Sequence, residues 1–285
     1  MTKIKLPTIR EIVDKYNLKA SKKLGQHFLF DLNLTEKIAR LSGVKENDVV
    51  FEIGPGPGGL TRSLLETRAN IHVIEMDQRF LPALDQLNQF YDGKLTVHCG
   101  DALDFDLNAL AKGKPFHVVS NLPYNVGTAL LIQWLTTPEL SWQSLTLMFQ
   151  LEVAQRITAK VDSKHYGRLS ILCAAIAEPE LIMNVPASVF TPPPKVESAV
   201  VSLRPLPLQQ RFDDLDTLAK ITGLAFGQKR KMLRASLKPL SADLEINISI
   251  WLQSLKIDPT TRPENLHPDQ FMQMAKAYKL ATRIT

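Results

Sequence analysis

The fold is decided by residues 49–59, Val49-Val50-Phe51-Glu52-Ile53-Gly54-Pro55-Gly56-Pro57-Gly58-Gly59. The run up to Ile53 is nearly all apolar, which is typical of a buried parallel strand, and leucines recur at helical spacing over residues 60–65. Gly54, Gly56 and Gly59 match G-x-G-x-x-G, in which missing side chains let the backbone approach a ligand beside a helix N-terminus. Strand, glycine turn and helix in this order predict an α/β fold.

An acidic residue ends the next predicted strand. Residues 71–74 are followed by Glu75, at about the 20-residue distance from the first glycine at which a carboxylate binds a ribose diol in dinucleotide folds. This pattern does not distinguish NAD from other adenosine-bearing cofactors. Glu52 places a second carboxylate just before the turn, which favours the cationic cofactor S-adenosylmethionine over a pyrophosphate. Glu52 could instead belong to a structural ion pair.

Two further predicted strands end in groups that can bind an amine. Residues 95–98 lead to Asp101, an acceptor for the amine of the cofactor's adenine unless it only caps the next helix. Residues 117–120 lead to Asn121-Leu122-Pro123-Tyr124. The amide carbonyl can accept an N–H, the proline stiffens the backbone and leaves carbonyls free, and the ring offers a face for a base. This tetrapeptide is suited to hold a planar amine.

Six motifs occur in order along the chain: Lys23-Leu24-Gly25-Gln26-His27-Phe28-Leu29, Glu52-Ile53-Gly54-Pro55-Gly56, Glu75-Met76-Asp77, Gly100-Asp101-Ala102, Asn121-Leu122-Pro123-Tyr124-Asn125 and Phe190-Thr191-Pro192-Pro193-Pro194-Lys195-Val196. Together they resemble the ribosomal RNA adenine dimethyltransferases, and within them the bacterial KsgA (RsmA) enzymes. The resemblance covers nearly the whole chain. It implies a class I S-adenosylmethionine-dependent methyltransferase (Rossmann-like) domain with a basic N-terminal arm, and a small all-helical RNA-binding domain. The stretch Pro205-Leu206-Pro207 predicts the boundary between them, which gives residues 1–205 and 206–285.

The resemblance also implies a function. The enzyme would use S-adenosylmethionine to dimethylate N6 of two adjacent adenosines in a hairpin loop near the 3′ end of small-subunit (16S) rRNA. It would act on a 30S precursor particle during ribosome biogenesis. By similarity, the cofactor would contact His27, Leu29, Gly54, Glu75, Asp101 and Asn121.

The chemistry of the target base predicts the catalytic residues. The adenine amine is a weak nucleophile until its N–H groups are held by the Asn121 carbonyl and by the backbone carbonyl of Leu122 or Pro123. The base must leave its stack, so we expect an aromatic clamp with Tyr124 on one face and Phe190 on the other. Phe190 could instead be a buried loop anchor.

Basic residues are concentrated at the two ends of the chain. Residues 1–30 carry seven Lys and Arg against two acids, residues 206–285 carry twelve against eight, and the remaining residues carry fifteen against nineteen. Solvated helix faces would give the same distribution, but phosphate binding at both ends is the stronger interpretation. The RNA-binding candidates are Lys22, Lys23, Arg230, Lys231 and Arg234. Arg230, Arg234 and Lys238 recur every four residues, which predicts a basic stripe on one helix face.

The composition is typical of a globular protein and disfavours a membrane or disulfide-rich one. The 285 residues, 45% hydrophobic and 22% charged, suit a globular protein with a sizeable core. No apolar run approaches the roughly 20 residues of a membrane span, and we expect a monomeric, cytoplasmic protein without membrane contact. Cys99 and Cys173 are too few for a disulfide framework, and no ligand spacing predicts a metal site.

Other segments complete the predicted fold. We expect a capped helix after Thr8, a strand over 145–149, a helix over 169–177, and two edge strands over 181–183 and 199–203. Beyond Pro205 the pattern predicts only helices, over 215–226, 232–237, 246–255 and 271–278.

Three alternative functions remain open from the sequence. A relative that dimethylates one adenosine of large-subunit rRNA and confers macrolide resistance is disfavoured by the triple proline and the C-terminal basic motif. A DNA adenine methyltransferase would need a DNA-reading domain, for which no motif is present. A small-subunit assembly factor, with methylation secondary or absent, fits the same charge distribution.

Overall fold

The computed structural model describes residues 6–21, 24–137, 141–228 and 230–282. Contacts divide the chain into two compact units, one of residues 1–154 with 180–204 and the other of residues 155–179 with 205–285. The domain boundary predicted at residue 205 stays a prediction. Contacts in addition group residues 155–179 with the C-terminal helices.

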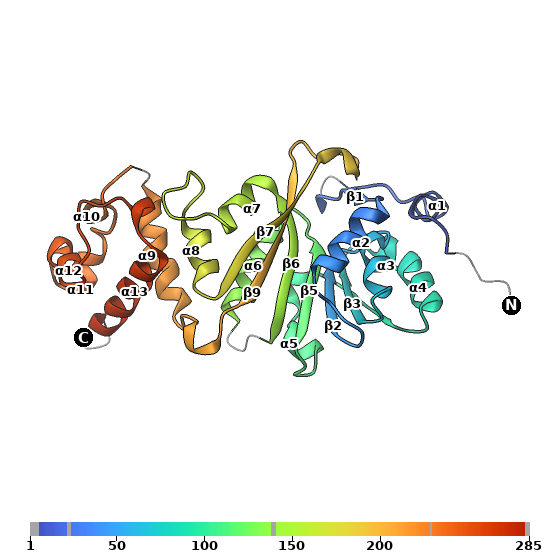
Figure 1. Cartoon of the computed structure of the whole chain (residues 1–285), viewed down its shortest axis with the longest axis horizontal. Helices are drawn as coiled ribbons and strands as arrows, with labels where there is room; N and C mark the ends of the chain where they lie inside the picture. The colour runs from blue at the N-terminus through green and yellow to red at the C-terminus, as the bar shows by residue number, and fades with distance from the viewer. Residues whose placement is uncertain (1–5, 22–23, 138–140, 229, 283–285) are drawn as a thin grey trace. The chain divides into compact units, whose positions relative to one another are not determined.

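A seven-stranded sheet with the order β4-β3-β2-β5-β6-β9-β7 organises the fold (Figure 1). Its strands are β2 (Val49–Ile53), β3 (Asn70–Glu75), β4 (Leu95–Cys99), β5 (Phe116–Asn121), β6 (Trp142–Gln150), β7 (Ala177–Val185) and β9 (Ser198–Pro205). The first five strands in this order, from β4 through β3, β2 and β5 to β6, pair in parallel, and β9 is antiparallel to β6. The chain order reverses at β2 and β5, and ligands of open α/β sheets bind outside the carboxyl ends of strands at such a switch point. The five strands predicted over residues 49–53, 71–74, 95–98, 117–120 and 145–149 are confirmed, and the structure pairs them in parallel.

Helices of the first unit cover this sheet. In Figure 1, α2, α3 and α4 gather beside β2 and β3, and their apolar side chains join one core cluster with Val50, Ile71 and Val73. The helices of this unit are α1 (Ile9–Lys15), α2 (Leu32–Leu41), α3 (Gly59–Leu65), α4 (Leu81–Phe90), α5 (Leu107–Leu110) and α6 (Gly127–Thr136), and α7 (Leu151–Ile157) begins in the first unit and ends in the second. The predicted capping box is confirmed, because Glu11 N donates to Thr8 Oγ1 and Thr8 N to Glu11 Oε2.

The arm between α1 and α2 forms a second, very short sheet. Strand β1 (Phe28–Leu29) pairs antiparallel with β8 (Phe190–Thr191), which places Leu29 opposite Phe190. The pairing fixes residues 28 and 29 of the predicted arm within the first unit. Short 3₁₀ turns occur at η2 (Gln78–Phe80), η3 (Ala102–Asp104), η4 (Ala187–Val189), η5 (Leu208–Gln210) and η6 (Pro263–Asn265).

The second unit is helical, as the sequence predicts beyond residue 205. It contains α8 (Arg168–Ala174), α9 (Leu215–Gly227), α10 (Leu233–Ser236), α11 (Leu240–Leu244), α12 (Ile248–Ser254) and α13 (Pro268–Thr282). The predicted helix over 169–177 was wrong at its end, because Ala177 already begins β7. Among the described helices, none combines the length and apolar character that a membrane crossing requires.

Candidate active site

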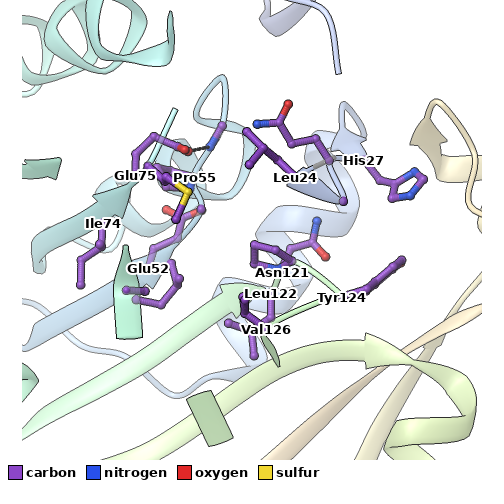
Figure 2. A pocket seen from close by; sticks show the side chains of 18 of the residues that line it. Leu24, His27, Glu52, Pro55, Ile74, Glu75, Asn121, Leu122, Tyr124 and Val126 are labelled. Atoms are coloured by element: carbon purple, nitrogen blue, oxygen red, sulfur yellow. Dashed lines mark hydrogen bonds between the residues drawn. The ribbon is translucent and has the colours of Figure 1, made fainter. Parts of the chain in front are cut away.

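A pocket opens at the carboxyl ends of β2, β3 and β5, the edge at which the predicted site residues were expected to meet (Figure 2). Its lining comes from the arm over 24–29, the glycine turn after β2, and the segments that follow β3, β4 and β5. The structure thus brings together, at one pocket, His27, Leu29, Gly54, Glu75, Asp101, Asn121, Leu122, Pro123 and Tyr124.

The glycine turn is shaped by contacts that exclude side chains. Gly54 has φ +65°, and a Cβ there would lie 3.2 Å from Pro123 Cγ. Gly59 begins α3, where a Cβ would lie 2.5 Å from the Leu29 carbonyl oxygen. The first glycine therefore lets the turn pass beside the tetrapeptide, and the last lets the arm cross over the start of α3.

Glu75 fixes the turn and faces the pocket. Gly56 N donates to Glu75 Oε2 at 3.0 Å, as drawn in Figure 2, and Asp77 N donates to Oε1 at 2.8 Å. Burial raises the pKa of Glu75, and these backbone donors act in the opposite direction. A carboxylate has about four acceptor positions, so about two remain for hydroxyl groups of a ligand.

Asp77 anchors the arm beside this carboxylate. Arg79 donates to it through Nε at 2.9 Å and pairs with it through Nη2 at 2.5 Å, while Gln26 Nε2 of the arm donates to Oδ2 at 3.0 Å. The bonds from Arg79 lower the pKa of Asp77 to about 2. The carboxylate is therefore ionised at neutral pH and holds the arm over the pocket. Sequence reasoning missed this pairing, because nothing local links residues 26 and 77.

Glu52 is a buried carboxyl in the wall of the same pocket. Its exposure is 2%, and Thr61 Oγ1 of α3 donates to its Oε2 at 2.7 Å. Burial raises the pKa of Glu52 to about 8, the Thr61 bond opposes this rise, and the charge of Glu75 adds to it. Burial without a charged partner therefore favours the protonated form of this carboxyl at neutral pH.

The tetrapeptide after β5 is held by bonds to neighbouring strands. Ser120 Oγ donates to the Ile53 carbonyl at 2.7 Å, which ties the end of β5 to β2. The Tyr124 hydroxyl lies 2.7 Å from Ser198 Oγ on β9. The Pro123 carbonyl accepts two backbone N–H groups, from Val126 at 3.2 Å and from Gly127 at 3.0 Å, so its acceptor capacity is used within the chain.

His27, and not Phe190, lies against the tyrosine ring. The ring centroids of His27 and Tyr124 are 5.5 Å apart with a 32° tilt, and His27 Nδ1 donates to the Pro192 carbonyl at 2.7 Å. Phe190 is 2% exposed within the core cluster and is not part of the pocket lining. The structure therefore leaves Phe190 in the position of a buried loop anchor, and its part in a base clamp stays a prediction.

The basic candidates belong to the second unit or lie outside the described residues. Lys22 and Lys23 are outside the described residues. Arg230, Lys231 and Arg234 are exposed in the second unit. The predicted stripe on one helix face was wrong, because α10 covers only Leu233–Ser236 and Arg230 has φ +76°, outside any helix. These side chains form an exposed basic turn and helix start instead.

The described residues contain no group of three or more His, Cys, Asp and Glu side chains arranged to hold a metal ion. The acidic groups of the pocket wall are the carboxyls of Glu52, Glu75 and Asp101, and none of the lining residues that the structure describes is Lys or Arg. Such a wall suits a cationic ligand and repels a pyrophosphate.

Comparison with known proteins gives consistent matches. The family model described as ribosomal RNA adenine dimethylase matches residues 17–280. Ribosomal RNA small subunit methyltransferase A of Phenylobacterium zucineum is 51% identical, over 96% of this chain and 93% of that protein. The protein of the same name from Maricaulis maris is 47% identical, over 97% of this chain and 96% of its own length.

Solved structures agree with these matches. A dimethyladenosine transferase from Plasmodium falciparum has a TM-score of 0.75 and 27% identity, over 90% of this chain and 98% of that one. The 23S rRNA methyltransferase ErmE has a TM-score of 0.65 and 25% identity, over 88% and 99% of the two chains.

Proposed function

The chain belongs to the ribosomal RNA adenine dimethylase family, and we propose that it dimethylates N6 of two adjacent adenosines near the 3′ end of 16S rRNA. It is an S-adenosylmethionine-dependent methyltransferase whose substrate is ribosomal RNA. The substrate particle is a 30S precursor in the cytoplasm, where the small subunit is assembled. The observation that carries the proposal is the tetrapeptide from Asn121 to Tyr124, which opens onto the same acidic pocket as Glu75.

The residues of the pocket fit S-adenosylmethionine. Glu75 keeps acceptor positions for the ribose hydroxyls, and Asp101 can accept from the adenine amine although its Oδ1 also caps η3 by accepting from Leu103 N at 3.0 Å. The backbone at Gly54 and the arm at His27 and Leu29 would enclose the remainder. When bound, the cofactor supplies an electrophilic methyl group on a positively charged sulfur.

Asn121 and the Leu122 backbone would hold the target amine. The carboxamide oxygen of Asn121 accepts one N–H, and a backbone carbonyl accepts the other, which draws the nitrogen lone pair out of the ring and orients it. Of the two carbonyls predicted for this role, that of Pro123 already accepts from Val126 and Gly127. We therefore assign the role to Leu122. After methyl transfer the amine becomes acidic and loses its proton to water.

Tyr124 would stack on the displaced base. Its hydroxyl contact with Ser198 holds the ring, and burial raises the pKa of this phenol, so the ring stays neutral. The His27 ring contacts the same tyrosine directly, which leaves no space for a base between the two rings. The base therefore either stacks on the opposite face of Tyr124 or displaces the His27 side chain.

Exposed basic residues of the second unit would bind RNA phosphates. Arg230, Lys231 and Arg234 extend from the turn and the start of α10, and neighbouring positively charged groups of this kind release counterions when they bind a polyanion. Lys22 and Lys23 of the arm, which lie outside the described residues, would add further phosphate contacts.

Nucleoside analysis of modified rRNA tests the proposal. Undermethylated small subunits incubated with the enzyme and S-adenosylmethionine should yield N6,N6-dimethyladenosine at two adjacent positions. Asn121→Ala should lower the rate by roughly a hundredfold or more while S-adenosylmethionine still binds in calorimetry. Asn33→Ala, at an exposed position of α2, is the matched control and should keep the wild-type rate. A fully active Asn121→Ala enzyme would refute the assigned role, and absence of dimethyladenosine with the wild-type enzyme would refute the function.

A further inference from the structure

Glu52 is a buried carboxyl in the wall of the pocket. It is 2% exposed, and the one side-chain bond found for it comes from the neutral hydroxyl of Thr61. Burying a carboxylate without a charged partner is unfavourable, so such a group takes up a proton. Among the described residues, the other titratable groups that line this pocket, Glu75, Asp101 and His27, include no Lys or Arg, and the charge of Glu75 raises the pKa of Glu52 further.

The position of Glu52 in the sheet places it opposite one part of the cofactor. Strand β2 lies between β3, which carries Glu75, and β5, which carries Asn121 (Figure 2). In the proposed function, Glu75 would bind the ribose and Asn121 would bind the amine that receives the methyl group. The sulfur of S-adenosylmethionine is covalently attached to both the ribose carbon and the transferred methyl, so it would be bound between these two residues. The Glu52 carboxyl enters the pocket at that place.

We propose that the Glu52 carboxyl is protonated in the ligand-free enzyme and ionises to meet the sulfonium, so that the pocket distinguishes the methyl donor from its uncharged product. This inference rests on the proposed methyltransferase function. The proton leaves Glu52 for solvent when the donor binds. After methyl transfer the sulfur is a neutral thioether, the buried carboxylate has lost its counter-charge, and it regains a proton from solvent.

Proton uptake then favours release of the product. S-adenosylhomocysteine has the same adenosine and amino-acid groups as the donor and lacks only the methyl group and the charge on sulfur. It would meet a protonated, neutral Glu52 and gain no ion pair. Four methyl transfers on one RNA require the product to be exchanged for new donor after each transfer. A pocket that binds S-adenosylmethionine more tightly than S-adenosylhomocysteine would favour this exchange.

Calorimetry in buffers with different ionisation enthalpies tests the inference without measuring activity. With a pKa of about 8, Glu52 should release about 0.9 proton per S-adenosylmethionine bound at pH 7 and about 0.1 at pH 9. S-adenosylhomocysteine should release close to none. The affinity ratio of donor to product should rise about tenfold per pH unit below pH 7.5 and become constant above pH 8.

Two variants separate Glu52 from other titrating groups. Glu52→Gln should abolish the proton release and the pH dependence of the ratio, while S-adenosylhomocysteine still binds. Thr61→Val keeps the shape of the buried side chain and removes the bond that lowers the pKa of Glu52, so proton release at pH 8 should rise from about 0.5 towards 1. The second variant tests the proposal even if the first does not fold.

The outcomes distinguish this inference from the function on which it rests. Equal proton release by both ligands, or binding of S-adenosylmethionine with no proton release, would overturn the role of Glu52 and leave the methyltransferase intact. No binding of either ligand to the wild-type protein would instead overturn the proposed function.

Discussion

Replacing Glu52 with glutamine should change how the stability of the ligand-free protein depends on pH. The side chain is buried, and its pKa rises from 4.5 in the unfolded chain to about 8 in the folded one. The folded state therefore holds the proton over a range in which the unfolded state loses it. The stability of the wild-type protein relative to Glu52→Gln is greatest below pH 4.5 and decreases as the pH rises towards 8.

The size of this effect follows from the shift. A shift of roughly 3.5 pKa units corresponds to at most about 5 kcal/mol between the two limits, since each unit is worth about 1.4 kcal/mol. Most of the decrease falls between pH 5 and pH 8. Glutamine stays neutral over the whole range and can still accept from Thr61, so the difference between the two proteins isolates the carboxyl.

Urea unfolding at several pH values measures this difference. The wild-type protein and Glu52→Gln are unfolded at pH 5, 6, 7, 8 and 9, and the difference between their unfolding free energies is plotted against pH. The unfolding free energy of the variant should rise relative to that of the wild type by about 1.4 kcal/mol per pH unit between pH 5 and pH 8, and by little above pH 8. Parallel curves over this range would refute the argument that the buried carboxyl is protonated.

Other predictions concern packing, stacking and RNA binding. Gly59→Ala should destabilise the protein by about 1–3 kcal/mol in urea unfolding, because its Cβ meets backbone at 2.5 Å; Gly223→Ala in α9 meets nothing within 4 Å and should stabilise by about 0.5–1 kcal/mol. Tyr124→Phe keeps the ring and loses the hydroxyl contact with Ser198, so stability should fall by about 1–2 kcal/mol and methyl transfer should persist; loss of transfer equal to that of Tyr124→Ala would contradict a stacking role. Charge reversal at Arg230 and Arg234 should weaken binding to small-subunit RNA and reduce the salt dependence by about two phosphate contacts, whereas an unchanged slope would place the RNA elsewhere.

The parallel sheet was predictable because its strands are short apolar runs that end in polar groups. The polar ends of β2, β3 and β5 mark the same edge, so Glu52, Glu75 and Asn121 could be assigned to one pocket before any coordinates. Helix α6 was not predicted, because it is apolar on most positions and shows no clear helical period. Helix α4 was not predicted either, although the sequence carried a signal for it. A proline stands at the start of the helix, and the apolar residues at 83, 84 and 87 have helical spacing and are buried in the structure.

The parts of the site that sequence reasoning missed depend on long-range contacts. Two-residue strands such as β1 and β8 have no periodicity, so nothing local showed that His27 would meet Tyr124 while Phe190 entered the core. The start of α10 is set by bonds from Leu233 N and Arg234 N to carbonyls of residues 261 and 259. Four-residue spacing alone therefore predicted a stripe that the backbone does not form.

The proposed function of this enzyme is the dimethylation of adenosines in small-subunit rRNA. The most direct measurement is transfer of labelled methyl groups from S-adenosylmethionine to undermethylated small subunits, naked small-subunit rRNA and large subunits, with nucleoside analysis of each product. We predict N6,N6-dimethyladenosine on assembled small-subunit particles, at four methyl groups per RNA, and none on large subunits. Labelling of large-subunit rRNA, or tight binding to small subunits without any methyl transfer, would contradict the account.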